Sequence, residues 1–284
     1  MRKILTVKEL ITILLDYNMD ALVYTNANGV PTGISLPNVC YGGGSEGETK
    51  KDCKEVIFDI QDEENEYITD ALEQFVDPYN GHAYVDLGLP SGTKWAKMNV
   101  GANSETDYGL YFAWGETEGY TASQVGTDKQ FNWSDYKYGT SSSNLTKYNA
   151  SDNKTHLELT DDAAAANMGG DWHMPTKEQC EELLNTTYVT NAWVTDYQGS
   201  GVNGRLFTSV SNGNTMFVPA AGYCVDGEVF SVGIDGYVWA SALFSEYVRN
   251  AWNFFFGGGG AGVDLSSRFS GQSVRGVVSL AEKI

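Results

Sequence analysis

The strongest constraint on the fold of this chain is the frequency with which glycine-containing turns interrupt its aromatic segments. The 284 residues include 32 Gly, 7 Trp, 17 Tyr and 12 Phe. Such a chain is too rich in glycine for a helical bundle and too aromatic for a disordered acidic polymer. Apolar and polar residues alternate over short stretches, which is typical of β-strands. The strands predicted from this pattern are 84–88, 94–100, 108–114, 205–210, 216–220 and 236–241.

Two helices are predicted among these strands. The first is a short helix over 160–167. The second covers 175–184, where Thr176 and Gln179 have the spacing of a capping box. Residues 119–155 are rich in Tyr, Ser, Asn and Thr, which predicts a long surface insertion. We therefore expect the α+β class, with short antiparallel strands and two helices.

The first 75 residues have a different pattern. Residues 6–16 place their apolar side chains on one face of a helix, and 21–24 and 56–60 have the composition of strands. Nothing in this part suggests chemistry, so we expect a module for attachment or assembly. The predicted organisation is a small α/β module at 1–75, a linker at 76–81 and the main domain at 82–284.

The charge of the chain is strongly acidic and unevenly distributed. The formal net charge is −19, from 18 basic and 37 acidic residues, which excludes nucleic acid as a partner because phosphate contacts need a basic surface. Residues 1–235 carry 14 basic and 34 acidic residues, and 236–284 carry 4 and 3. An acidic body of −20 therefore ends in a segment of +1, with nine aromatic residues in 237–269.

The amino-terminal sequence does not predict export or membrane insertion. Lys8 and Glu9 interrupt its apolar stretch, and no small-x-small cleavage site follows. No run of 18 apolar residues occurs along the chain. We expect no signal peptide and no membrane insertion.

Cysteine and histidine spacing predicts neither a metal site nor a cofactor. The cysteines form no CxxC pair, and the histidines are isolated from one another. We expect free thiols, and a Cys40–Cys53 disulfide across a hairpin stays open as an alternative. The residues concerned are Cys40, Cys53, Cys180, Cys224, His82, His156 and His173.

Five phrases resemble a known family when taken in order. The resemblance covers about 200 residues, from 82 to 278. It is to the Fibrobacter-type major paralogous domain of Bacteroidetes and their phages, a C-type lectin fold of the formylglycine-generating-enzyme subclass. The phrases are YVDLGLPSGTKWAKMNVGA (84–102), YGLYFAWGET (108–117), GGDWHMPTKEQCEELL (169–184), MFVPAAGY (216–223) and SVRGV (273–277).

The end of the chain resembles the variable proteins of diversity-generating retroelements. In that family an error-prone reverse transcriptase rewrites adenines, so AAY codons scatter over many residue types on the ligand-binding surface. Residues that such codons cannot encode number 4 of 39 in 237–275 and 51 of 284 overall, a depletion in the expected direction. Codon scatter would also explain the four glycines at 257–260, for which a flexible loop is the alternative.

The resemblance implies a variable region at about 237–275 that binds a ligand. The expected framework residues are Trp239, Trp252, Phe254, Phe256, Arg268 and 271–275. The expected exposed anchors are Phe244, Tyr247, Arg249, Phe255 and Phe269, because aromatic and arginine side chains give large contact areas. The full ligand-binding set is Val238, Ala240, Ala242, Phe244, Tyr247, Val248, Arg249, Asn253, Phe255, Gly257, Asp264, Ser266, Ser267, Phe269 and Ser270.

The function expected from this resemblance is receptor recognition, without catalysis. The chain would be a phage or prophage tail protein, in the virion or in the host cytoplasm before assembly. It would bind a bacterial cell-surface protein or glycan, and residues 1–75 would contact other virion proteins.

Three alternatives remain. The first is a bacterial lectin-like protein with a fixed ligand. The second is a formylglycine-generating-type enzyme, which lacks support because no cysteine follows Cys224. The third is a calcium-dependent lectin, whose Trp-Asn-Asp motif is only approximated at 132–135.

Overall fold

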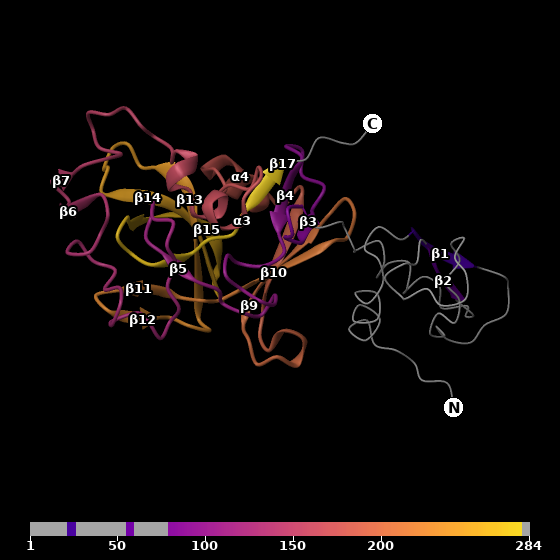
Figure 1. Cartoon of the computed structure of the whole chain (residues 1–284). Helices are drawn as coiled ribbons and strands as arrows, with labels where there is room; N and C mark the ends of the chain where they lie inside the picture. Colours follow the sequence, from indigo (N-terminus) through magenta and orange to yellow (C-terminus); the bar gives the residue numbers. More distant parts are fainter. Residues whose placement is uncertain (1–21, 27–54, 60–78, 280–284) are drawn as a thin grey trace, which may run out of the picture. The chain divides into compact units, whose positions relative to one another are not determined.

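The chain divides into two compact units, Met1–Phe75 and Val76–Ile284. The computed structural model describes residues 22–26, 55–59 and 79–279 (Figure 1). In the first unit, β1 (Leu22–Asn26) and β2 (Glu55–Asp59) pair in parallel. The helix expected over 6–16 and the cysteines Cys40 and Cys53 lie outside the described residues.

The second unit is built around a five-stranded sheet in the order β15-β14-β13-β16-β5. Strands β13, β14 and β15 form two successive antiparallel hairpins, and β16 pairs with β13 in parallel. The strands are β5 (Tyr111–Phe112), β13 (Asp235–Leu243), β14 (Asn250–Gly257), β15 (Gly260–Ser267) and β16 (Gln272–Ser273).

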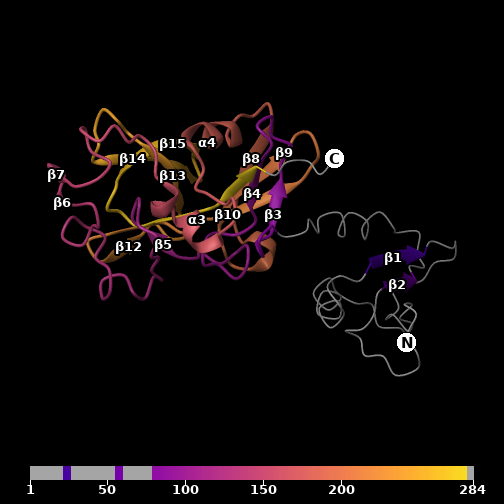
Figure 2. The same ribbon diagram turned by 45° about the horizontal axis from the view of Figure 1, so that its top comes forward.

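Smaller sheets surround this central one. The hairpins β6–β7 and β11–β12 lie toward one end of the unit, and β3 and β4 lie at the other (Figures 1 and 2). One three-stranded sheet contains β3 (Tyr84–Asp86), β4 (Thr93–Ala96) and β17 (Val277–Ser279), and another contains β8 (Val189–Val194), β9 (Gly204–Ser209) and β10 (Thr215–Pro219). The hairpins are β6 (Gly139–Ser141) with β7 (Asn144–Leu145) and β11 (Tyr223–Val225) with β12 (Glu228–Phe230).

The helices begin where side chains satisfy their first backbone amides. The predicted capping box of α4 (Lys177–Leu183) is confirmed, because Gln179 N–H donates to Thr176 Oγ1 at 3.2 Å and Thr176 N–H donates to Gln179 Oε1 at 2.9 Å. The helix predicted over 160–167 begins later than expected, because Asp162 caps α3 (Ala163–Met168) and leaves the turn η2 (Leu159–Asp161) before it.

The class is α+β, as predicted: short strands, mostly antiparallel, with α3 and α4, and a short turn η3 (Tyr197–Gly199). None of the helices among the described residues is long and apolar enough to cross a membrane.

The central sheet separates two hydrophobic clusters. Trp239 and Ala251 belong to the cluster that includes Trp114. Val238 and Phe254 belong to the cluster of β9, β10 and α4. Because both faces of β13 are covered by core, its side chains are buried from Val238 to Leu243.

The surface insertion predicted at 119–155 is confirmed only in part, because most of its residues are exposed or half-buried but several aromatic residues enter the core. Phe131, Tyr136, Tyr138 and Tyr148 from this segment are buried in the core. The tyrosines can be buried because their hydroxyl groups find hydrogen-bond partners: Tyr136 Oη donates to the Trp114 carbonyl at 2.8 Å, and Tyr148 Oη donates to Asp161 at 2.8 Å. A composition rich in tyrosine therefore conceals a segment that contributes to the core.

Two further expectations change with the structure. The predicted linker at 76–81 falls in the second unit, where Tyr79 accepts a hydrogen bond from Trp172 Nε1 at 3.0 Å through its carbonyl. The glycines at 257–260 form the tip of the β14–β15 hairpin, with Gly257 paired to Gly260.

Candidate ligand-binding surface

The segment expected to carry the ligand site folds into the hairpins β13–β14–β15 and the connecting loop 244–249. Residues opposite one another in antiparallel strands share a face. Tyr237, Phe255 and Gly262 are opposite one another, as are Trp239, Asn253 and Asp264, of which Trp239 and Asn253 are completely buried. We call the accessible part of this face, made of Tyr237, Phe255, Gly262 and Asp264, the outer face.

Framework residues predicted in this segment are buried on both faces of the sheet, Trp239 in one hydrophobic cluster and Phe254 and Phe256 in the other. Trp239, Phe254, Phe256 and Arg268 are completely buried, and Trp239 Nε1 donates to the Phe112 carbonyl at 2.8 Å. Trp252, also expected as framework, is only half-buried.

Arg268 holds the loop 244–249 through main-chain carbonyls. Its Nη1 donates to the carbonyls of Val248 at 3.0 Å and Tyr148 at 2.8 Å, and its Nη2 donates to the carbonyl of Lys147 at 3.0 Å. Its Nε donates to Tyr136 Oη at 2.9 Å. The loop is therefore fixed to the core without contacts from its own side chains to Arg268.

The loop carries a cluster of exposed aromatic surface. Phe244 lies 5.8 Å from Tyr247 and 5.4 Å from Trp252 between ring centroids. The Lys177 ammonium lies 4.8 Å from the Trp252 ring centroid. Tyr247 is 61% exposed, and Arg249 is exposed beside it. Large rings held close together are suited to contact with a partner.

Six residues of the expected ligand-binding set lie in the core and do not belong to the surface. Three of them are on β13, both faces of which are packed, and the other three are buried on β14 and after β15, so none is accessible to a macromolecular ligand. They are Val238, Ala240, Ala242, Asn253, Gly257 and Ser270.

The other nine residues of that set reach the surface wholly or in part. Tyr247, Arg249 and Asp264 are exposed. The half-buried residues are Phe244, Val248, Phe255, Ser266, Ser267 and Phe269.

Phe269 packs inward more than expected. Its ring lies 4.9 Å from that of Trp133, in the segment that approximates a calcium-lectin motif. In that segment Asp135 accepts from the backbone N–H of Asn132 at 3.2 Å, and Asn132 accepts from Ser134 N–H at 2.9 Å. These side chains stabilise a turn.

The outer face has aromatic neighbours that were not among the residues predicted from the sequence. Tyr223 lies 5.1 Å from Tyr237 and 5.6 Å from Phe230, and Tyr237 lies 5.1 Å from Phe255. We call Phe230, Tyr223, Tyr237 and Phe255 the aromatic row. Burial, followed by the charges of Asp235 and then Asp264, raises the pKa of Tyr237 to about 12.

A sequence signal for this hairpin does exist. Asp226-Gly227 stands between the apolar runs of β11 and β12, and both residues have positive φ, 49° and 78°. Asp-Gly between two apolar runs is a strong signal for a two-residue hairpin.

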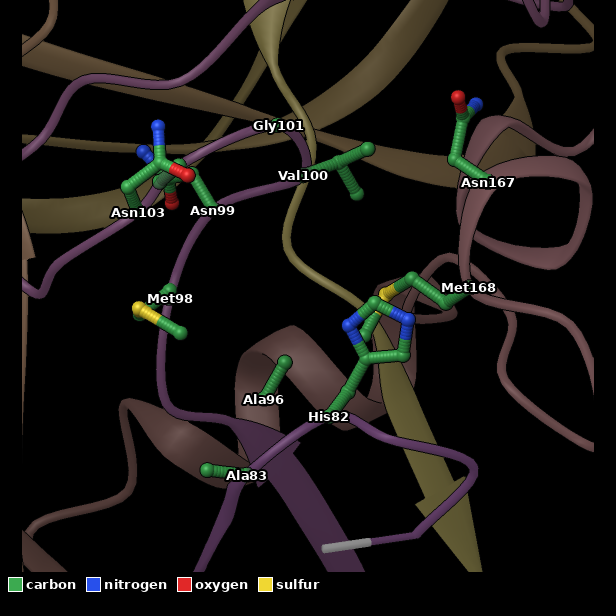
Figure 3. A pocket seen from close by; sticks show the side chains of 11 residues that line it. His82, Ala83, Ala96, Met98, Asn99, Val100, Gly101, Asn103, Asn167 and Met168 are labelled. Atoms are coloured by element: carbon green, nitrogen blue, oxygen red, sulfur yellow. The ribbon is translucent and has the colours of Figure 1, made fainter. Parts of the chain in front are cut away.

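A separate pocket of about 250 Å³ lies outside the predicted surface (Figure 3). His82 and Met168 lie side by side in it, and Asn99 and Asn103 line another part. Both polar atoms of the Asn99 side-chain amide already have partners. Its Nδ2 donates to the Tyr108 carbonyl at 3.0 Å, and its Oδ1 accepts from Arg275 Nε at 2.9 Å. None of the expected ligand-binding residues lines this pocket.

The cysteine thiols in the described part of the chain are not activated. Cys180 and Cys224 are buried and free, and burial raises the pKa of both thiols. Thiolate chemistry needs the opposite shift. Within residues 79–279, no three His, Cys, Asp or Glu side chains are grouped so as to hold a metal ion.

Comparison with known proteins leaves the family unassigned. No protein-family model matches the sequence, and neither a curated protein nor a solved structure matches it.

Proposed function

We propose that this protein binds a receptor through a surface made of the loop 244–249 and the outer face of β13–β14–β15. The binding residues on this surface are diversified by a retroelement. The protein has a C-type lectin fold and acts at the tail of a phage or prophage. The receptor is a protein or glycan on a bacterial cell surface, and residues 1–75 contact other virion proteins.

One observation carries the binding role: the loop is fixed by main-chain contacts while its side chains remain available. Arg268 is completely buried and donates to the Val248 carbonyl, and the Arg268 N–H donates to the Arg249 carbonyl at 3.1 Å. Tyr247 and Arg249 are exposed on the same loop. A rigid scaffold that presents exchangeable side chains suits a recognition surface.

The diversification rests on the resemblance and on the pattern of burial. Framework residues such as Trp239 and Phe254 are buried, whereas Asp264 and Tyr247 in the same segment are exposed. Substitution at exposed positions usually changes stability by no more than about 0.5 kcal/mol. A changing sequence there is compatible with a constant fold.

The binding role is tested by substitution on the loop. We expect Tyr247→Ala combined with Arg249→Ala to weaken binding to receptor-bearing cells at least tenfold, because exposed aromatic and arginine side chains dominate interfaces. Val210→Ala is the matched control, since Val210 is 57% exposed and lies outside the surface. Equal binding by the double variant and the wild-type chain would contradict the proposal.

The retroelement is tested in DNA. We expect a near-identical template repeat beside a reverse transcriptase gene, with mismatches confined to adenines of the template. Isolates should differ at exposed positions of 237–270 and agree over 1–235. If the repeat is absent and the double variant still loses binding, the protein is a recognition protein with a fixed ligand.

A further inference from the structure

The aromatic row is bordered by carboxylates that have no cationic partner. Asp235 extends over the β14 main chain, since a Cβ at Gly257 would lie 2.4 Å from Asp235 Oδ1. Asp264 is exposed on the outer face and accepts from Leu265 N–H at 2.8 Å. Neither carboxylate forms an ion pair with any residue in 79–279.

A third carboxylate, that of Glu228, lies on the same side of the β11–β12 hairpin as Phe230 of the aromatic row. Glu228 is two residues from Phe230, so their side chains share a face, and Glu228 is exposed. Arg249 is the one basic residue in 222–264, and it lies on the loop at the opposite end of β13. Arg205 from β9 also reaches this end of the hairpin, where its Nη1 donates to the Gly257 carbonyl at 2.8 Å and its Nε donates to Asn191 Oδ1 at 2.6 Å. The carboxylates that border the row therefore have no paired cation within residues 79–279.

The surface next to the row is open and apolar. At Gly262, opposite Phe255, an added Cβ would meet no atom within 4 Å. Val232 and Ile234, in the turn that leads into β13, are 43% and 63% exposed. Both are large apolar side chains left exposed, so they are available for contact with apolar residues of a partner.

We propose that the aromatic row, with Asp235 and Asp264, binds an arginine or lysine side chain of a protein partner. The cation lies against the ring faces, where the π-electrons attract positive charge. Its N–H groups donate to the carboxylates. Apolar residues of the partner pack on Val232 and Ile234. The inference rests on the proposed function for the outer face and selects a protein as the receptor.

The carboxylates distinguish this partner from a choline-type headgroup. A quaternary ammonium group has no N–H, so it could not satisfy Asp235 and Asp264 by hydrogen bonding. An arginine side chain presents five donors in a planar fork and also stacks on aromatic rings.

The test is an NMR titration of the full chain, with ¹³C-labelled tyrosine and phenylalanine rings. The probes are acetyl-Leu-Arg-Leu-amide, the same peptide with neutral citrulline in place of arginine, and choline. We expect the arginine peptide to shift the ring signals of Tyr237 and Phe255, identified with Tyr237→Phe and Phe255→Leu. Its Kd should be at least tenfold lower than those of the citrulline peptide and choline.

Charge-neutralising variants locate the contact. We expect Asp235→Asn and Asp264→Asn each to raise the Kd of the arginine peptide about threefold, as for exposed charge pairs. Glu118→Gln is the matched control, because Glu118 is exposed and lies outside both the loop 244–249 and the outer face, and the Kd of this variant should equal that of the wild-type chain.

Several outcomes would overturn the inference. Equal affinity for the citrulline peptide would remove the cation from recognition, and tighter choline binding would assign the row to a headgroup. An equal effect of Glu118→Gln would reduce the contact to general attraction by an acidic protein. If the peptide does not bind at the row but cell binding still depends on Tyr247 and Arg249, this inference fails and the proposed function stands. If the peptide binds at the row but cell binding does not depend on Tyr247 and Arg249, the proposed function fails alone.

Discussion

Arg268 and Arg275 offset the acidic residues when the charge of the C-terminal segment is summed from the sequence, but neither of them lies on its surface. Arg268 and Arg275 are completely buried, and their guanidinium groups donate mainly to main-chain carbonyls. Of the charged residues in 236–279, Glu246, Arg249 and Asp264 remain exposed. The surface of this segment therefore carries −1, although the sum over the same residues is +1.

Arg268 is the residue whose loss should cost most. We expect Arg268→Met to lower the free energy of unfolding by about 3 kcal/mol, because it leaves the buried carbonyls of Tyr148, Val248 and Lys147 without a donor. Urea denaturation measures the change. Arg249→Met, at an exposed position, should change stability by less than about 0.5 kcal/mol. Similar values for the two variants would contradict the role given to Arg268.

Asp161 should account for part of the stability that the protein loses at acidic pH. Burial raises the pKa of this carboxyl, but hydrogen bonds from Lys147, Tyr138 and Tyr148 outweigh burial and hold the pKa well below its usual value of 3.8. A depressed carboxyl pKa stabilises the fold at neutral pH, and this stability is lost as the pH falls below about 4.

We expect Asp161→Asn to be about 2 kcal/mol less stable at pH 7 and to show a flatter dependence of unfolding free energy on pH between about 5 and 2. Asp128→Asn, at an exposed position, serves as the control. An unchanged slope in Asp161→Asn would show that another group governs the acid response.

At the scale of elements, local signals predicted α4 and failed for β14 and β15. The spacing of Thr176 and Gln179 is a chemical requirement of a helix start, so the sequence alone locates it. The strands β14 and β15 meet at four glycines, which have low strand propensity and resemble a flexible loop. Their pairing depends on tertiary packing of Phe254 and Phe256, which no local pattern contains.

The hairpin tip should tolerate side chains that the adjacent strand does not. A Cβ at Gly258 or Gly259 would meet no atom within 4 Å, whereas one at Gly236 would lie 2.0 Å from the Phe256 ring. We expect Gly258→Ser and Gly259→Ser to change stability by less than about 0.5 kcal/mol and Gly236→Ala to cost about 1–3 kcal/mol. Thermal unfolding would show the difference, and a large loss in Gly258→Ser would contradict an open tip.

For the candidate site, the sequence predicted which segment carries it, but not which of its residues are accessible or which residues surround them. Tyr247, Arg249 and Asp264 are exposed as expected of contact residues, but Val238, Ala240 and Ala242 are buried because core packs on both faces of β13. Which side of a strand is covered depends on segments distant in sequence. The same holds for Tyr223 and Phe230, which reach the outer face only through the fold.

At the scale of the molecule, the second unit has a core of its own. Its two hydrophobic clusters draw their buried residues from 85–278. We expect a fragment of residues 76–284 to unfold at the same temperature as this unit in the full chain, measured by calorimetry. A fall of more than about 4 °C, equivalent to roughly 1–2 kcal/mol for a domain of this size, would show that residues 1–75 stabilise it.

The way Arg268 holds the loop has a consequence for how mutations combine. Main-chain carbonyls are the same for every residue, so the anchor is indifferent to the side chains at Val248 and Arg249. Substitutions at these positions therefore leave the anchoring hydrogen bonds in place, and the loop should keep its main-chain position when its side chains change. Such an anchor would let the loop accept new side chains without compensating changes at Arg268.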